Sequence, residues 1–372
     1  MPKIIPDLHR QSANRPARIA AQTSLLLLAF ALCAAAQTSN LERDQEIVFF
    51  PALGHLVDGG KSWELEIHGC VYEPDQRRVA LALLHEALDL KHVQMNPAES
   101  ALFAERARLF MVDHKRGKKI VLRIASKQFV LGKSRPDGQF SGVVRVPVAE
   151  IKKDAYPALG IRAMLPPEDH RAFAGELNLF ADTGIAVISD IDDTIKVTQV
   201  RDRNATLRNT FLEPFRPVPG MPEVYRGWAE KSGAQFCYVS ASPWQLFLPL
   251  SEFVRANGFP AGVFYLKNFR WKDESFFNLF EGPEKYKPAV IGPLLKRFPD
   301  RRFVLVGDSG ERDPEIYAAF ARQYPRQVAR IFIRDVTAEP AEAERYQRVF
   351  RDLPPGLWKV FHNPREIADA IP

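Results

Sequence analysis

The second half of this 372-residue chain contains five short apolar runs in which polar and apolar residues do not alternate. The runs cover 185–188, 236–239, 303–306, 328–333 and 357–361, and helical patterns separate them. Strands without polar alternation are buried on both faces, as in a parallel sheet covered by helices. In such a sheet, chemistry gathers beyond the carboxyl ends of the strands. Residues 181–372 are therefore predicted to form an α/β domain.

Residues 38–180 follow a different pattern. Segment 62–73 alternates Trp63, Leu65 and Ile67 with polar residues, which is typical of a half-buried strand. Helices are expected over 75–90 and 98–112, and further strands over 120–124, 142–148, 160–165 and 175–180. We predict a β-rich, sandwich-like domain with helical insertions over residues 38–180.

The first 36 residues are predicted to be a targeting segment. Arg10, Arg15 and Arg18 precede a mostly apolar run over 19–36, and this order is typical of a secretory leader cleaved before Gln37. The alternative is an uncleaved anchor, because about 18 apolar residues are close to the minimum for a bilayer span. We therefore expect an exported protein, periplasmic or secreted, or one anchored in a membrane by this segment.

Charge and cysteine content restrict the classes of partner. The formal net charge of +6 is small for this length and lies partly in the leader, so the sequence does not suggest nucleic-acid binding. Only Cys70 and Cys237 follow the leader, and a disulfide framework is not indicated.

The most informative motif follows the apolar run 185–188, which ends abruptly in Ser-Asp-Ile-Asp-Asp-Thr over 189–194. Carboxylates as close in sequence as those of Asp190, Asp192 and Asp193 repel one another, and a bound cation is the natural compensation. An acidic turn without metal is the alternative.

A second acidic segment, Gly-Asp-Ser-Gly-Glu-Arg-Asp over 307–313, follows the apolar run 303–306. Two such strand ends, brought together in a parallel sheet, would form an oxygen-rich pocket suited to Mg²⁺. Ser240, after the run 236–239, and Lys287, at the start of a helical stretch, are weak signals alone. Their order relative to the two acidic segments makes them candidates for the same site.

This arrangement resembles the haloacid dehalogenase superfamily, whose four motifs match Asp190-x-Asp192-x-Thr194, Ser240, Lys287, and Gly307-Asp308 with Asp313. Within it, the chain looks like the actin-patch-type phosphatidate phosphatases and their bacterial relatives. The segments that carry this closer likeness are 188–196, 219–221, 238–246, 307–309 and 313–317. The resemblance implies a Rossmann-like parallel sheet of the haloacid dehalogenase type.

The resemblance also implies a mechanism. Asp190 would attack phosphorus and form an aspartyl phosphate, and Asp192 would protonate the departing alcohol, with its pKa raised by neighbouring carboxylates. Mg²⁺ would be bound by the carboxylates of Asp190 and Asp308 and the backbone carbonyl of Asp192, with support from Asp313.

The remaining motif residues have supporting roles in the same scheme. Lys287 and Ser240 would bind phosphoryl oxygens, and Thr194 would fix the turn. Asp193 is interpreted as structural. Lys196, Arg201 and Arg203 are either contacts for substrate anions or solvated loop charges, and both interpretations stay open.

The expected function is a magnesium-dependent phosphatidate phosphatase that acts on phosphatidate or a related phospholipid at a membrane surface. Aromatic residues in the insertion between Pro243 and Lys287 suit an interface, or they simply pack the insertion. One alternative is an exported phosphomonoesterase for soluble substrates. Another is a non-catalytic lipid- or protein-binding module on an inactive phosphatase scaffold.

Overall fold

The computed structural model describes residues 37–74, 85–86, 88, 93–108, 110–152, 157–267 and 283–371. Residues from Ser39 onward form one compact unit. The predicted leader, most of the helix expected over 75–90, and much of the aromatic insertion lie outside the described residues. The boundaries given above for the domains stay predictions.

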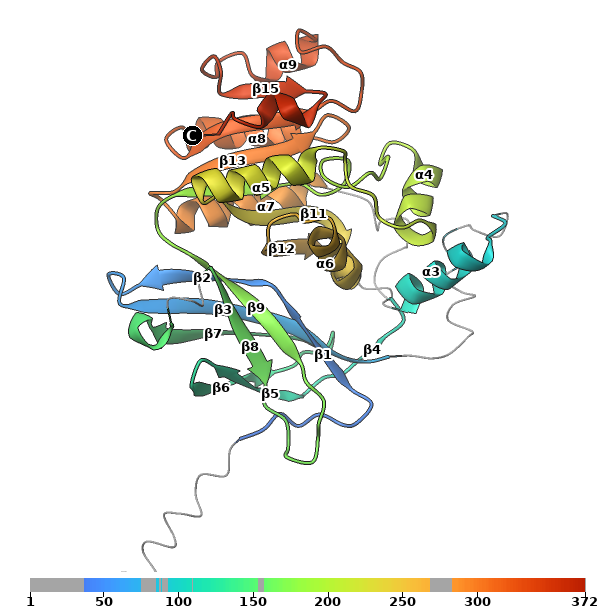
Figure 1. The fold of residues 1–372 in the computed structure, drawn as a ribbon, viewed down its shortest axis with the longest axis vertical. Helices are drawn as coiled ribbons and strands as arrows, with labels where there is room; N and C mark the ends of the chain where they lie inside the picture. Colours follow the sequence, from blue (N-terminus) through green and yellow to red (C-terminus); the bar gives the residue numbers. More distant parts are fainter. Residues whose placement is uncertain are drawn as a thin grey trace, which may run out of the picture. The chain divides into compact units, whose positions relative to one another are not determined.

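The first half of the chain forms a nine-stranded sheet (Figure 1). Its order is β1-β3-β2-β9-β8-β5-β6, and β4 and β7 also pair with β3. The strands are β1 (Glu46–Phe50), β2 (Ala52–Val57), β3 (Ser62–Glu73), β4 (Asp113–His114), β5 (Lys119–Ile124), β6 (Lys127–Lys133), β7 (Gln139–Pro147), β8 (Ala158–Ala163) and β9 (Ala174–Phe180).

The sheet is curled (Figure 1). Its long strand β3 pairs with β1 and β2 along one edge and with β7 along the other. The alternating residues Trp63, Leu65 and Ile67 of β3 are buried in a core shared with β5, β8 and β9. The predicted β-rich half is thus confirmed. The predicted sandwich takes the form of one curled sheet, not two stacked ones.

A helix and a short 3₁₀ turn are described between these strands. The helix is α3 (Pro97–Arg108), which confirms the insertion expected over 98–112 although it ends earlier. The turn is η2 (Val148–Glu150).

The second half contains a separate six-stranded sheet in the order β12-β11-β10-β13-β14-β15, with every neighbouring pair parallel. Its strands are β10 (Ile185–Ser189), β11 (Gln235–Pro243), β12 (Gly262–Lys267), β13 (Arg302–Asp308), β14 (Val328–Arg334) and β15 (Trp358–Phe361). Counted from β10, this is the order 3-2-1-4-5-6 of doubly wound sheets, which bind ligands where the order reverses. The reversal lies between β10 and β13. The parallel sheet is confirmed, and its assignment to the haloacid dehalogenase type stays a prediction.

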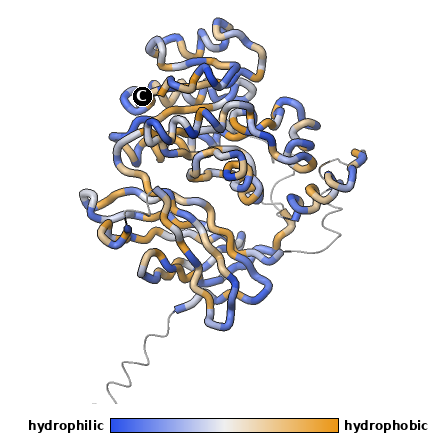
Figure 2. The backbone as a smooth tube through the Cα atoms, viewed as in Figure 1, coloured by the Kyte–Doolittle hydropathy of each residue, from blue (hydrophilic) through white to orange (hydrophobic). Residues whose placement is uncertain are grey.

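Helices cover both faces of the parallel sheet (Figure 1). Val187 of β10 packs into a core with α5 and α6, whereas Ile188 packs into one with α7, α8 and α9. Figure 2 shows apolar residues along the strands and mixed polarity on the surrounding helices. The helices of this half are α4 (Arg203–Leu207), the π-helix η4 (Arg208–Leu212), α5 (Met221–Ser232), η5 (Trp244–Leu246), α6 (Phe247–Ala256), α7 (Pro283–Arg297), α8 (Asp313–Gln323), α9 (Glu344–Val349) and η7 (Pro364–Ile367).

None of the helices in the described ranges is long and apolar enough to cross a membrane.

Candidate active site

Asp190 lies directly after β10, where the strand order reverses. Its backbone N–H donates to the carbonyl of Val306 in β13 at 2.9 Å, which joins the two strand ends. The side chain is buried, and its Oδ1 is 2.9 Å from the Nζ of Lys287. Oδ2 has no hydrogen-bond partner in the described part of the chain. One oxygen of Asp190 is thus held by a cation while the other is free.

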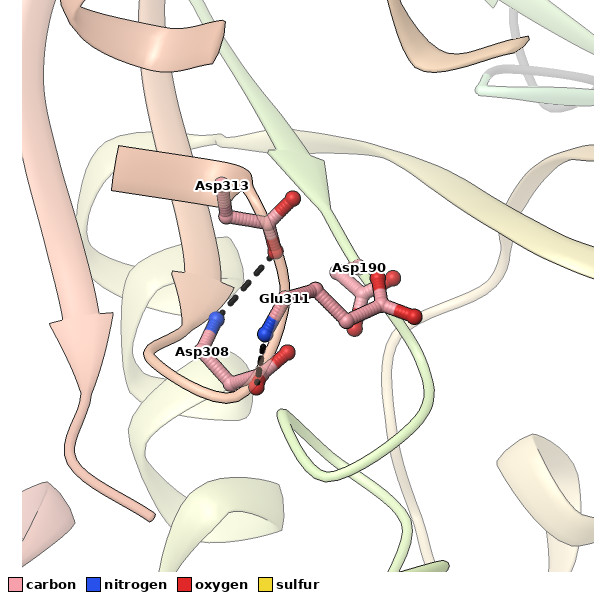
Figure 3. Close-up of side chains that lie close together, drawn as sticks. All are labelled: Asp190, Asp308, Glu311 and Asp313. Carbon is pink, nitrogen blue, oxygen red and sulfur yellow. Dashed lines mark hydrogen bonds between the residues drawn. The ribbon is translucent and has the colours of Figure 1, made fainter. Parts of the chain in front are cut away.

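Three further carboxylates meet Asp190 at this sheet edge (Figure 3). Asp308 ends β13, Glu311 lies in the following loop, and Asp313 begins α8. One oxygen from each of the four residues lies within 4.8 Å of the others. Asp308 and Asp313, which the sequence predicted as metal ligands with Asp190, are therefore brought together with it.

Hydrogen bonds within the acidic loop fix the positions of these carboxylates. Asp313 Oδ2 accepts the backbone N–H of Asp308 at 3.2 Å, and Asp308 Oδ1 accepts that of Gly310 at 2.6 Å. Gly307 is required here, because a Cβ at this position would overlap the carboxylate of Asp313. The loop is therefore shaped before any ligand arrives.

Lys287, near the start of α7, lies among three of the acids. Its Nζ is 2.9 Å from Asp190, 2.8 Å from Glu311 and 2.5 Å from Asp313, and the side chain is 1% exposed. Within the described ranges, one ammonium group thus lies in the cluster of four carboxylates, and it contacts three of them.

The electrostatics of the cluster indicate a deficit of positive charge. Burial raises the pKa of Asp190, Lys287 opposes this, and Asp313 raises the pKa further. Burial raises the pKa of Asp308 as well, and Asp313 and Glu311 add to the increase. Asp308 Oδ2, like Asp190 Oδ2, has no hydrogen-bond partner among the described residues. Two buried, unpaired carboxylate oxygens in such a group fit the oxygen-ligand preference of a hard divalent cation.

Asp192 faces a different set of partners. Its Oδ1 is 2.8 Å from Lys196 Nζ and accepts the hydroxyl of Thr198 at 2.8 Å. Its Oδ2 accepts the hydroxyls of Ser240 and Ser242, both at 2.9 Å. Its side chain thus binds these residues, and its predicted role as a metal ligand through the backbone carbonyl stays a prediction.

The expectation that neighbouring carboxylates raise the pKa of Asp192 is wrong for this structure. Burial alone would raise the pKa, but the charge of Lys196 and the hydrogen bonds from Lys196, Thr198 and Ser240 outweigh it and lower the pKa to about 2. Asp192 is therefore ionised at neutral pH when no ligand is present.

Two hydrogen bonds fix the hydroxyl of Ser240. Its Oγ accepts the N–H of Ser242 at 2.9 Å while donating to Asp192, so both serine hydroxyls converge on one carboxylate oxygen. Thr194 is fully buried, and its hydroxyl has no hydrogen-bond partner within the described ranges. Its predicted role in fixing the turn stays a prediction.

Asp193 has a structural role, as its sequence position suggested. It adopts a positive φ of 56°, a conformation that is uncommon for residues other than glycine. Its carboxylate accepts the backbone N–H groups of Thr198, Gln199 and Val200. These bonds close the loop that carries Thr198 to Asp192.

A cavity of about 420 Å³ opens onto these groups and is lined by both Asp190 and Asp192. Three arginines line it as well. The guanidinium of Arg345 donates to the carbonyls of Ser309 and Glu311 and forms an ion pair with Glu315. Arg201 has no hydrogen bond or ion pair among the described residues, and Arg312 is 60% exposed with only a loose ion pair at 3.9 Å. Two arginines at the cavity thus remain available to an anion.

Several residues of the site were missed or left open by the sequence reasoning, among them Glu311, Ser242 and Lys196. Glu311 stood unassigned within the motif 307–313, and its place between two predicted ligands was the available signal. Ser242 follows Ser240 by two residues and shares its partner. Lys196 was left between two interpretations, and it is 2% exposed in an ion pair instead of solvated.

Residues 185–335 match the family model described as the catalytic domain of phosphatidate phosphatase APP1. The matched segment contains every residue of the site described above except Arg345. The match supports the predicted actin-patch-type family and the phosphatase class, whereas the superfamily and the bacterial relationship stay predictions.

Two curated relatives are fungal. Phosphatidate phosphatase APP1 of Saccharomyces cerevisiae is 40% identical over 160 residues, which are 42% of this chain and 27% of the yeast protein. An uncharacterized protein of Schizosaccharomyces pombe is 30% identical over 200 residues, which are 52% of this chain and 32% of that protein. The matched regions thus span about a third or less of these relatives.

Similarity to solved structures is low. The Parabacteroides merdae β-glucuronidase aligns with a TM-score of 0.25 and 8% identity over 78% of this chain and 34% of that one. Such a score supports no conclusion about fold or function.

Proposed function

We propose that this chain is a magnesium-dependent phosphatidate phosphatase with a catalytic domain of the haloacid dehalogenase type. It hydrolyses phosphatidate to diacylglycerol and phosphate through an aspartyl phosphate on Asp190. The observation that carries the chemistry is the meeting of Asp190 with Asp308, Glu311 and Asp313 where the strand order reverses. The match of residues 185–335 to the APP1 catalytic domain supports the substrate class.

Asp190 is the nucleophile because it lines the cavity with one carboxylate oxygen free of hydrogen bonds. A bond forms between this carboxylate and phosphorus while the bond from phosphorus to the diacylglycerol oxygen breaks. Water then hydrolyses the aspartyl phosphate, which restores Asp190 and releases phosphate. Two easier steps replace one difficult displacement.

Asp192 transfers the protons of both steps. Substrate binding brings a second negative charge beside it, which raises its pKa from the low value of the unliganded site. The protonated carboxyl gives its proton to the departing alcohol oxygen, and the resulting carboxylate accepts a proton from the attacking water. Ser240 and Ser242 hold the carboxylate towards the cavity.

The carboxylates of Asp190, Asp308 and Asp313 would hold the magnesium ion, and Glu311 is close enough to join them. When bound, the ion supplies positive charge that reduces repulsion between the carboxylates and the phosphate. Lys287 adds a fixed positive charge beside Asp190.

Arg201 and Arg312 make the cavity suitable for an anionic ester presented at a membrane surface. The basic and then apolar order of residues 1–36 supports an exported location, with cleavage or anchoring of that segment. A soluble phosphomonoester as the natural substrate is the alternative that the assay must separate.

The test is phosphate release by the purified chain from phosphatidate in mixed micelles and from nucleotide and sugar phosphates. We expect preference for phosphatidate, loss of activity on chelation with recovery in Mg²⁺, and a decrease of at least about 10³-fold in Asp190→Asn. Asp182→Asn, an exposed residue before β10, is the matched control and should retain activity.

Each arm of this test can fail separately. Activity that survives in Asp190→Asn contradicts the nucleophile. Stronger turnover of soluble esters than of phosphatidate assigns the chain to the soluble class. No turnover of any phosphoester in Mg²⁺ leaves a non-catalytic binding module.

A further inference from the structure

Helix α3 comes from the β-rich half of the chain yet contacts the elements that surround Asp192. Arg106 in its last turn is 4% exposed, and its Nη1 donates to the carbonyls of Thr210 at 2.6 Å and Glu213 at 2.8 Å. Burial lowers the pKa of Arg106 to about 10, so its guanidinium stays charged at neutral pH. A buried arginine committed to two carbonyls of another segment fixes that segment against the helix.

Phe215 extends this contact towards the active site. The guanidinium carbon of Arg106 is 3.9 Å from the centroid of the Phe215 ring, and the Nζ of Lys196 is 4.9 Å from the same centroid. Lys196 is buried, and its Nζ lies 2.8 Å from Asp192 Oδ1. Cation–π contacts are strongest when the cation is desolvated, as both are here. A continuous line of contacts therefore joins Arg106, Phe215, Lys196 and Asp192.

A second line of contacts runs through the π-helix η4. Its Thr210 carbonyl accepts from Arg106, and its Asn209 donates to the carbonyl of Thr198 at 3.0 Å. The Thr198 hydroxyl in turn donates to Asp192 Oδ1. Such π-helical turns often occur at functional sites. Both lines begin at α3 and end at the same carboxylate oxygen.

We propose that helix α3 positions Asp192 for proton transfer, with Arg106, Phe215 and Lys196 as positioning residues. The β-rich half thereby contributes to catalysis, and the inference rests on the proposed function. These three residues do not line the cavity, so they act through Asp192 and not on substrate. Proton transfer needs the carboxyl within hydrogen-bond reach of the departing oxygen, and a displacement of about 1 Å can cost 10²-fold in rate.

The test compares two soluble esters that differ in their need for a proton. Benzyl phosphate releases an alkoxide that must be protonated, whereas p-nitrophenyl phosphate releases a phenolate that departs without a proton. The full chain is assayed in Mg²⁺, and kcat/KM is measured because it reports on the step in which the alcohol departs. For Arg106→Met we expect a loss of about 10-fold with benzyl phosphate and less than about 2-fold with p-nitrophenyl phosphate.

Further variants separate positioning from general damage to the fold. Arg108→Met, an exposed arginine on the same helix, should leave both kcat/KM values unchanged. Arg106→Lys, which keeps the charge, should recover part of the benzyl phosphate activity. If Arg106→Met does not fold, Phe215→Leu removes only the ring and must show the selective loss in its place.

Equal losses on the two esters, or no loss on either, would overturn the positioning role while leaving the proposed function intact. No turnover of either ester or of phosphatidate by the unmodified chain would reject the proposed function and this role together.

Discussion

Removal of Lys287 should destabilise the fold, and magnesium should restore part of the stability that the variant loses. Its Nζ contacts Asp190, Glu311 and Asp313 at 2.9, 2.8 and 2.5 Å, and the side chain is 1% exposed. Lys287→Met would leave three buried or partly buried carboxylates without their ammonium partner. Breaking a buried ion pair on one side costs about 3–5 kcal/mol, which is a large part of the total stability of about 5–15 kcal/mol of a typical domain.

Urea unfolding in EDTA and in Mg²⁺ measures this effect. In EDTA we expect Lys287→Met to lose about 3–5 kcal/mol relative to the unmodified chain. Magnesium at 100 times its dissociation constant should return about 2.7 kcal/mol, because it binds only the folded cluster. Lys296→Met, an exposed lysine of the same helix, is the control and should change stability by less than about 0.5 kcal/mol.

The reasoning is refuted if Lys287→Met unfolds like the unmodified chain in EDTA. It is also refuted if magnesium leaves the stability of both proteins unchanged, because the carboxylates would then not form a cation site.

Two further predictions concern the geometry of the loop and the entrance of the cavity. Gly307→Ala should displace Asp313. We expect magnesium affinity, measured by calorimetry, and the rate of phosphate release each to fall by at least about 10-fold. Gly160→Ala, where a Cβ meets nothing within 4 Å, is the control and should change neither. Arg201→Ala and Arg312→Ala should each raise KM for a phosphate ester by about 10-fold, the loss of one charged hydrogen bond, without lowering the unfolding midpoint. An unchanged KM in both would exclude these arginines from substrate binding.

The catalytic half could be predicted from sequence because its strands and its site residues are adjacent in the sequence. Each apolar run is followed at once by its chemistry, and parallel strands bring their carboxyl ends to one edge. Asp190 and Asp308 thus meet for the same reason that the runs 185–188 and 303–306 pair side by side.

The curl of the first sheet could not be predicted in this way. Strand β2 pairs in parallel with β9, which lies more than a hundred residues later, and no local pattern encodes that partner. Pro51 also separates the short strands β1 and β2, and neither was expected from alternation.

The surroundings of Asp192 depended on contacts distant in sequence. Lys196 follows Asp192 by four residues, but its burial depends on Phe215 and, beyond that ring, on Arg106 of the first half. The sequence places a charged residue in a loop and cannot show that a helix from another part of the chain covers it. The prediction of a raised pKa for Asp192 was wrong for the same reason.

The central claim is that Asp190 forms a covalent bond to phosphorus. The direct measurement is to quench the magnesium-loaded chain during turnover, reduce it with borohydride, and locate the modified residue by peptide mass spectrometry. An aspartyl phosphate is reduced to homoserine, so we expect homoserine at position 190 only when substrate and Mg²⁺ are both present. Unmodified Asp190 in a chain that is actively releasing phosphate, or a label on another residue, would contradict the account.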